Sequence, residues 1–320
     1  MKTFRFAFAA LLLFNGYAAA QVWPSKPIRV LVPFAAGGLG EFMMRVIAPP
    51  IEVKLGQRFI VESKPGADGA IGAAEIGRAA PDGYNLLLAA TNVYVVIPHI
   101  RRNVPYDPIE GFAPVAMIVD APLLVVVSAS LPVKSLKDLA AHIRANPGKL
   151  NVGSPGAGTP AHILGEYFGR MNGGMLHVPY KGSQAVGQAI QTNEVQVLFG
   201  TVAAVLPQLK GGSARPIAAL ARERIAGFPE LPTGAESGFP ELGAAGNWWG
   251  LVAPRGTDAR IVERLSSEIR AALADPAVRK RFADVGMIPI GSSPAELGQF
   301  IRTESARWKG IVERTGIQPE

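Results

Sequence analysis

Ile28-Arg-Val-Leu-Val-Pro-Phe34 has the pattern of a buried strand, and it leads through the glycine-rich stretch Ala35-Ala-Gly-Gly-Leu-Gly40 into a helix-like segment. The same succession occurs again, where Leu150-Asn-Val-Gly-Ser154 leads through Pro155-Gly-Ala-Gly-Thr-Pro160 into a second helix-like segment. A bend of this kind leaves backbone N–H groups unpaired, and the helix dipole adds partial positive charge there. Two such bends predict two lobes that each offer an anion-binding edge to a shared cleft. Alternatively, the glycines only allow the tight turns that any open α/β sheet needs.

Strand-like and helix-like runs alternate along nearly the whole chain, which is typical of a mostly parallel sheet flanked by helices. Two apolar, β-branched runs between Phe112 and Ala129 are separated by Asp120-Ala-Pro122, which we interpret as a crossing between lobes. A proline-rich stretch from Phe228 to Pro240 leads the chain back through Trp248-Trp-Gly-Leu-Val-Ala253. We therefore predict an α/β fold with two lobes joined by two crossovers that can hinge. The predicted lobes are residues 21–121 with 239–320, and residues 122–238.

Three helix-like segments close the chain and are expected to pack on the lobe that contains both chain ends. They cover residues 258–273, 276–285 and 294–314. Asp275 and Ser293 each stand directly before a proline, which is a good signal for the start of a helix.

The first twenty residues have the pattern of a secretory signal peptide. Lys2 and Arg5 supply positive charge, Phe6 to Phe14 form an apolar run, and Ala18-Ala-Ala20 gives a small-residue cleavage pattern before Gln21. The apolar run is too short to cross a bilayer as a stable helix. We expect cleavage near Ala20 and Gln21, export across the inner membrane and a periplasmic location.

The composition indicates a binding partner that is small and anionic. The formal net charge of +7 falls to +5 when Lys2 and Arg5 are removed, and the positive charges are spread along the chain. A nucleic-acid-binding protein would instead show basic clusters with stacking aromatics. The chain has no cysteine, so it does without the disulfides that stabilise many small secreted domains. We expect a monomer that binds no nucleic acid.

Neither metal catalysis nor serine hydrolysis is supported by the motifs. The histidines show no HExxH or paired-ligand spacing. They are His99, His142, His162 and His177. Ser154 lies at a strand-to-helix bend, but the elbow Gly-x-Ser-x-Gly is incomplete, and Pro155 lacks the amide that would follow a nucleophile in an oxyanion hole.

A dinucleotide site is a closer alternative. Gly156-Ala-Gly-Thr-Pro-Ala161 fits a relaxed G-x-G-x-x-A pattern between a strand and a helix. That pattern also requires an acidic residue at the end of the next strand, where this chain has Val178-Pro-Tyr-Lys-Gly182. Lys181 replaces the acid, which counts against NAD, so we expect no cofactor.

Binding without reaction then accounts best for the polar residues at the second bend. Ser154 and Thr159 offer hydroxyls beside free amides, and His162 lies just inside the following helix. Such a set can hold a carboxylate. Thr159 is equally well explained as a helix cap, His162 as a surface residue and Lys181 as a solvated charge.

Ordered motifs along the mature chain give it a specific resemblance. The chain resembles the Bug family, the extracytoplasmic solute-binding receptors of tripartite tricarboxylate transporters. The segments that carry the resemblance are Trp23–Arg29, Val32–Gly38 with Arg45, Lys64–Gly69, Ala80–Tyr84, Tyr106–Pro108 with Phe112–Val115, Leu131–Ser135, Pro147–Asn151, Gly153–Thr159 with His162, Val178–Gly182 and Trp248–Pro254.

The resemblance implies a Venus-flytrap fold in which the loops Phe34–Gly38 and Ser154–Thr159 bind a ligand carboxylate, partly through ordered water. The loaded receptor would deliver its ligand to a large and a small membrane subunit. We expect no catalytic residue and no metal ligand. The candidate ligand-binding residues are Phe34, Ala35, Ala36, Gly37, Gly38, Thr91, Asn92, Ser154, Gly156, Gly158, Thr159, His162, Tyr180, Lys181, Gly200 and Thr201.

Two positions depart from the family pattern. Glu41 stands where family members usually have Asp, and Gly200-Thr201 stands where many have Asp, often followed by Asn. The missing carboxylate weakens the case for a ligand with an ammonium group. We therefore predict a carboxylate without a free amine.

The remaining alternatives concern the step after binding. A receptor closes on its ligand and presents it to the transporter. A sensor would present the same loaded cleft to a signalling partner. An exported enzyme acting on an organic acid would need a base–nucleophile pair or a ligand cluster at the loops, and the sequence shows neither.

Overall fold

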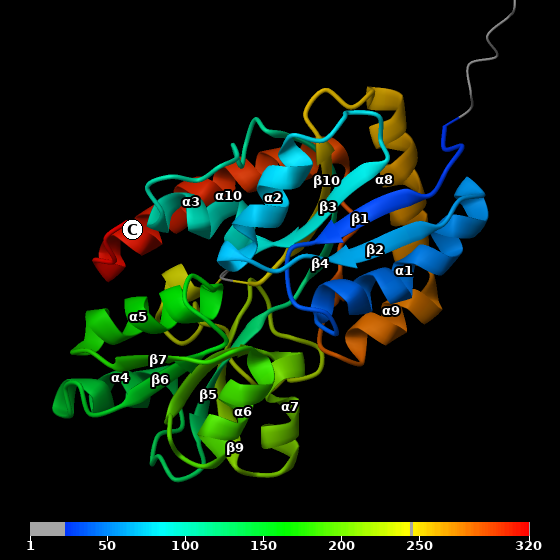
Figure 1. Cartoon of the computed structure of the whole chain (residues 1–320). Helices are drawn as coiled ribbons and strands as arrows, with labels where there is room; N and C mark the ends of the chain where they lie inside the picture. Colours follow the sequence, from blue (N-terminus) through cyan, green and yellow to red (C-terminus); the bar gives the residue numbers. More distant parts are fainter. Residues whose placement is uncertain (1–22, 244–245, 320) are drawn as a thin grey trace, which may run out of the picture.

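The computed structural model describes residues 23–243 and 246–319, so the expected signal peptide at 1–20 lies outside them. The described chain forms two α/β lobes, one above the other in Figure 1. The predicted two-lobed α/β fold is confirmed. Within the described ranges, no helix is both long and apolar enough to cross a membrane.

Lobe 1 is built around a six-stranded sheet in the order β11-β4-β10-β3-β1-β2. Its strands are β1 (Ile28–Val32), β2 (Phe59–Ser63), β3 (Asn85–Ala90), β4 (Phe112–Asp120), β10 (Trp249–Pro254) and β11 (Ile288–Pro289). Strands β1 to β4 run in one direction, and β10 and β11 run against them, so the sheet is mixed.

Helices cover both faces of this sheet. They are α1 (Leu39–Leu55), η1 (Ala67–Gly69), α2 (Ala70–Gly77), η2 (Asn92–Val96), α3 (Ile97–Ile100), α8 (Ala259–Ala274), α9 (Pro276–Ala283) and α10 (Pro294–Thr315). In β1, Val30 and Val32 face one apolar cluster and Leu31 faces the other. Burial on both faces explains why the strand is a continuous apolar run.

Lobe 2 has a five-stranded sheet in the order β7-β6-β8-β5-β9, in which only β5 runs against the others. Its strands are β5 (Leu123–Ser128), β6 (Asn151–Ser154), β7 (Leu176–Pro179), β8 (Val197–Thr201) and β9 (Ala214–Leu220). Its helices are α4 (Leu136–Ala145), α5 (Pro160–Asn172), α6 (Ser183–Gln191), α7 (Val202–Lys210) and η3 (Pro240–Leu242). The apolar clusters place α4 and α5 on one face and α6 and α7 on the other.

The expected helix starts at the chain end are present. Asp275 caps α9 by accepting hydrogen bonds from the amides of Ala277 and Val278. Ser293 and Glu296 form a reciprocal capping box at the start of α10.

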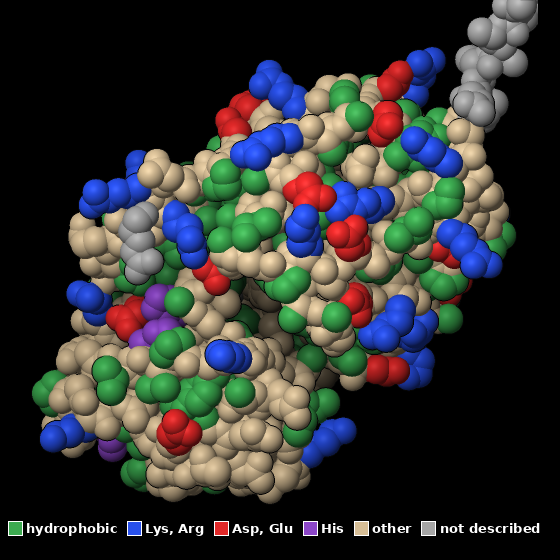
Figure 2. All heavy atoms as spheres, viewed as in Figure 1, with side chains coloured by type: hydrophobic (Ala, Val, Ile, Leu, Met, Phe, Trp, Pro, Cys, Tyr) green, Lys and Arg blue, Asp and Glu red, His purple; other side chains and the backbone are tan. Residues whose placement is uncertain are grey.

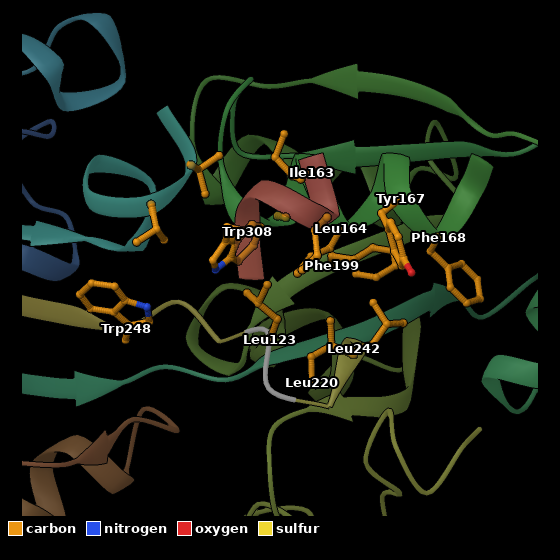
Figure 3. Close-up of a cluster of buried hydrophobic side chains, with 14 of the residues drawn as sticks. Leu123, Ile163, Leu164, Tyr167, Phe168, Phe199, Leu220, Leu242, Trp248 and Trp308 are labelled. Atoms are coloured by element: carbon orange, nitrogen blue, oxygen red, sulfur yellow. The ribbon is translucent and has the colours of Figure 1, made fainter. Parts of the chain in front are cut away.

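The two crossovers lie side by side and are joined by backbone hydrogen bonds. The amide of Ala121 donates to the carbonyl of Asn247 at 3.3 Å, and the amide of Asn247 donates back at 3.1 Å. The first crossing lies between β4 and β5. The second comes later than the expected boundary at 239, because Phe239 packs edge-on against Phe168 of lobe 2 at 5.2 Å and Leu242 lies beside Leu220 (Figure 3).

The lobes also meet through the last helix of the chain. Helix α10 of lobe 1 packs on α5 of lobe 2, and Trp308 is fully buried beside Leu164 in the shared apolar cluster (Figure 3). Arg314 donates a hydrogen bond to the hydroxyl of Tyr167 at 3.2 Å. This contact connects the lobes independently of the crossovers.

A second contact between the lobes lies at the start of α7. Gly286, between α9 and β11, has a φ of +70°, and a Cβ built there would lie 2.4 to 2.8 Å from three side-chain carbons of Val202. Such distances are far below van der Waals contact. Only glycine allows these two backbone segments to approach each other so closely.

Replacing Gly286 with alanine should destabilise the protein by about 1–3 kcal/mol, because the added methyl group overpacks the contact with Val202. Urea unfolding of Gly286→Ala measures the loss. Gly256→Ala is the matched control, since Gly256 has a φ of +85° and open space around its Cβ position. Equal losses in the two variants would show that backbone strain alone is responsible and that the contact is unimportant.

Candidate functional site

A cavity of about 490 Å³ lies between the two lobes, where Figure 2 shows a hollow. It is lined from lobe 1 by the first glycine-rich bend and from lobe 2 by the second. Eight of the sixteen predicted site residues line it. They are Phe34, Ala35, Gly38, Asn92, Thr159, Lys181, Gly200 and Thr201. The two bends therefore face the same space, as the repeated strand–bend–helix pattern predicted.

The first bend already holds a carboxylate of its own. The side chain of Glu41 accepts hydrogen bonds from the amide of Gly37 at 2.9 Å and from the hydroxyl of Ser63 at 2.5 Å. The Ser63 hydroxyl, and then the Gly37 amide, lower the pKa of Glu41. One amide donor at the start of α1 is therefore already bonded to a carboxylate of the protein itself and is not available to a ligand.

The second bend is fixed by its own hydroxyl groups. Thr159 donates from Oγ1 to the carbonyl of Gly156 at 2.8 Å and accepts the amide of His162 at 3.3 Å, which caps α5. Ser154 also donates to the Gly156 carbonyl, at 2.9 Å. Ser154 is fully buried and does not line the cavity. Its hydroxyl therefore stabilises the loop and does not face the cavity.

Two histidines support the same bend. Nδ1 of His162 accepts the amide of Gly158 at 3.1 Å, and the imidazole of His162 stacks on that of His177 with 3.9 Å between ring centroids. Nε2 of His177 lies 2.7 Å from Oγ of Ser154. Burial, and then the neighbouring His162, lower the pKa of His177 to about 4. Burial also lowers the pKa of His162, which favours the neutral form of that ring.

No pattern in the sequence indicates this cluster, because His177 comes from β7 and the other ring from α5. With Glu166 one turn along α5, the two histidines place possible ligand atoms within 4.8 Å of one another. However, Nδ1 of His162 is already an acceptor, and stacked rings do not direct two nitrogens at one ion. A metal would require the rings to separate. As it stands, the cluster holds the loop in shape.

Other predicted residues lie outside the cavity lining. Thr91 is buried, and its Oγ1 donates to the carbonyl of Trp248 at 3.2 Å, which ties lobe 1 to the second crossover. Trp248 itself stacks on Tyr94 with 5.2 Å between centroids. The remaining predicted residues that do not line the cavity are Ala36, Gly37, Gly156, Gly158, His162 and Tyr180.

Several lining residues are not among the sixteen predicted site residues. Trp249 lines the cavity and meets Phe34 edge-on at 5.2 Å, so one tryptophan of the pair packs at the junction and its neighbour faces the cleft. Others outside the predicted set include Leu39, Ser183, Val186, Leu198, Ala204, Val205 and Asn247. Ser183 and Ala204 could have been predicted from the helix starts after β7 and β8, because helices that follow parallel strands begin at one edge of the sheet.

Acid should destabilise the protein partly through the stacked histidines. Because burial lowers the pKa of His177 in the folded state to about 4, this contribution is fully present above the unfolded value of about 6.5 and is lost as the pH falls towards 4. We expect His177→Gln to reduce the slope of unfolding free energy against pH in this window. An unchanged slope would contradict the assignment, and NMR titration of the imidazole signals provides a direct check.

Comparison with known proteins agrees with this architecture. Residues 43–317 match the family model described as "Tripartite tricarboxylate transporter family receptor". Protein BugT of Bordetella pertussis is 36% identical over 309 residues, which cover 94% of this chain and 92% of BugT.

Solved structures agree as well. A structure described as that of a periplasmic transporter is 36% identical with a TM-score of 0.83, covering 92% of this chain and 99% of that one. The R. palustris protein Rpa4515, solved with adipate, is 31% identical with a TM-score of 0.84, covering 93% of this chain and all of Rpa4515 (100%). The resemblance to the Bug receptors is confirmed, and the chain belongs to the receptor family of tripartite tricarboxylate transporters.

Proposed function

We propose that this solute-binding receptor captures a small organic carboxylate without a free amine in the cavity between its lobes. Membership of the family makes it a transport receptor and not an enzyme. The observation that carries the proposal is the meeting of two glycine-rich bends, one from each lobe, at a single cavity of about 490 Å³. Cavities of this size are typical of sites for small organic ligands.

Two polar side chains that line the cavity each have an atom without a partner, and these atoms are available to a ligand. Thr201 is 8% exposed, and its hydroxyl makes no hydrogen bond to the described chain. Asn92 is 4% exposed, and its Nδ2 donates to the carbonyl of Asp68 at 2.8 Å, while its Oδ1 has no partner among the described residues. Neither atom is fully enclosed by protein, and both side chains line the cavity, so they support a polar ligand.

The charges around the cavity support a ligand that lacks an ammonium group. Among its described lining residues Lys181 is the charged one, and no aspartate or glutamate is present. The nearby carboxylate of Glu41 is bonded to its own loop, and that of Asp68 is paired with Arg101 at 2.7 Å. An ammonium group in the cavity would be desolvated without a counter-ion, which is unfavourable.

Delivery to a transporter follows from the family. We infer that the mature receptor works as a monomer in the periplasm, after cleavage near Ala20, and transfers its ligand to a large and a small membrane subunit. The adipate in the structure of the relative Rpa4515 supports a carboxylate as the ligand. The paired crossovers at Ala121 and Asn247 provide the place where the lobes would hinge.

A thermal-shift panel tests the ligand class. We expect saturable stabilisation by carboxylates that are recovered unchanged, with weaker effects for amino acids of the same skeleton, such as glutamate against glutarate and norleucine against hexanoate. Stabilisation by aspartate or glutamate alone would contradict the proposal. Turnover of a bound acid would contradict the receptor role.

Thr201→Val tests the unpartnered hydroxyl. The change keeps the volume of the side chain and removes a hydrogen bond to the ligand, so it should weaken binding by about 1–3 kcal/mol, as measured by calorimetry. Stability should change little, because Thr201 makes no side-chain cap to α7. Thr303→Val, on the exposed face of α10, is the control. Equal affinities of the two variants would remove Thr201 from the site.

A further inference from the structure

The two lobes differ in the charges that lie near the cavity, at the starts of their helices. In lobe 2, helices α5, α6 and α7 begin directly after β6, β7 and β8, and none has an acidic residue in its first turn. Lobe 1 has the carboxylates of Glu41 at the start of α1 and Asp68 in η1. Helix starts attract anions and nearby carboxylates repel them. Lobe 2 is therefore the side that favours an anionic group.

Lobe 2 also has the donors that such a group needs. The amides of Thr159 and Ala161, at the start of α5, make no hydrogen bond within the described chain. Lys181 stands between β7 and α6 at the edge of the cavity, and the free hydroxyl of Thr201 is at the start of α7. All of these groups belong to residues that line the cavity.

Most of the other side chains that line the cavity are apolar, and Asn92, Ser183 and Asn247 are the polar ones. Phe34, Leu39 and Trp249 contribute the lobe 1 side, and Phe34 and Trp249 hold each other edge-on at 5.2 Å. Val186, Leu198 and Val205 contribute the lobe 2 side behind the helix starts, and all three are buried. A second carboxylate at this end would be desolvated, since the described lining has no cation besides Lys181.

We propose that the cavity selects a monocarboxylate with an apolar body, its carboxylate on lobe 2 beside Lys181 and its body between Trp249 and Leu198. This selectivity rests on the proposed function, because it assumes that the interlobe cavity binds the carboxylate. It goes further by excluding the second acidic group. Burial of the apolar body would supply most of the affinity, and the carboxylate would set its orientation.

Calorimetry with hexanoate and adipate tests the selectivity, because the two six-carbon acids differ only in the exchange of a terminal methyl group for a carboxylate. The mature, full-length receptor should bind hexanoate at least tenfold more tightly than adipate. Equal or tighter binding of adipate would overturn this inference and leave the proposed function standing. Failure of every carboxylate in the thermal-shift panel would overturn the proposed function itself.

Lys181→Met tests the position of the carboxylate. The change removes the cation and keeps a flexible side chain, so hexanoate affinity should fall about tenfold. Lys149→Met, also an exposed lysine of lobe 2 but outside the cavity lining, should bind hexanoate like the parent protein. Affinities that are the same in both variants would overturn the placement of the carboxylate beside Lys181.

Discussion

Backbone N–H groups at the start of a helix have no partner within that helix, and this structure gathers several such starts at one cavity. The gathering follows from topology, because helices that come after parallel strands begin at the same edge of a sheet. In lobe 2, β6, β7 and β8 run in one direction and are followed by α5, α6 and α7. The proposed anion-binding character of the cleft thus follows from the fold before any side chain is considered.

The remaining contacts hold that edge of one lobe against the corresponding edge of the other. Paired backbone hydrogen bonds at Ala121 and Asn247 join the crossovers, and α10 packs on α5 through Trp308. Because α5 also carries the second bend at its start, the packing of α10 fixes the orientation of a loop that lines the cavity. Helix α5 therefore contacts both the apolar core and the cleft.

Much of the fold could be predicted from sequence, because its signals are local. The bend residues, the break at Asp120-Ala-Pro122 and the cap at Asp275 each act on neighbours in the chain. The features that could not be predicted depend on distant segments. The direction of the Ser154 hydroxyl is set by His177, which lies on another strand, and the late second crossing is set by the packing of Phe239 on Phe168. Side chains at a bend indicate a site, but their distant neighbours decide whether they face the ligand or support the loop.

The two lobes would contribute differently to the free energy of closure. A ligand can stabilise the closed state only through contacts that are absent when the lobes are apart. In the proposed binding mode the carboxylate is held by lobe 2 alone, so its hydrogen bonds exist in both states and cannot favour closure. The contacts with Phe34, Leu39 and Trp249 form only when lobe 1 covers the ligand, and apolar burial grows with the area removed from water. The free energy that closes the receptor would then come from the apolar body of the ligand, while the charge determines which molecules enter.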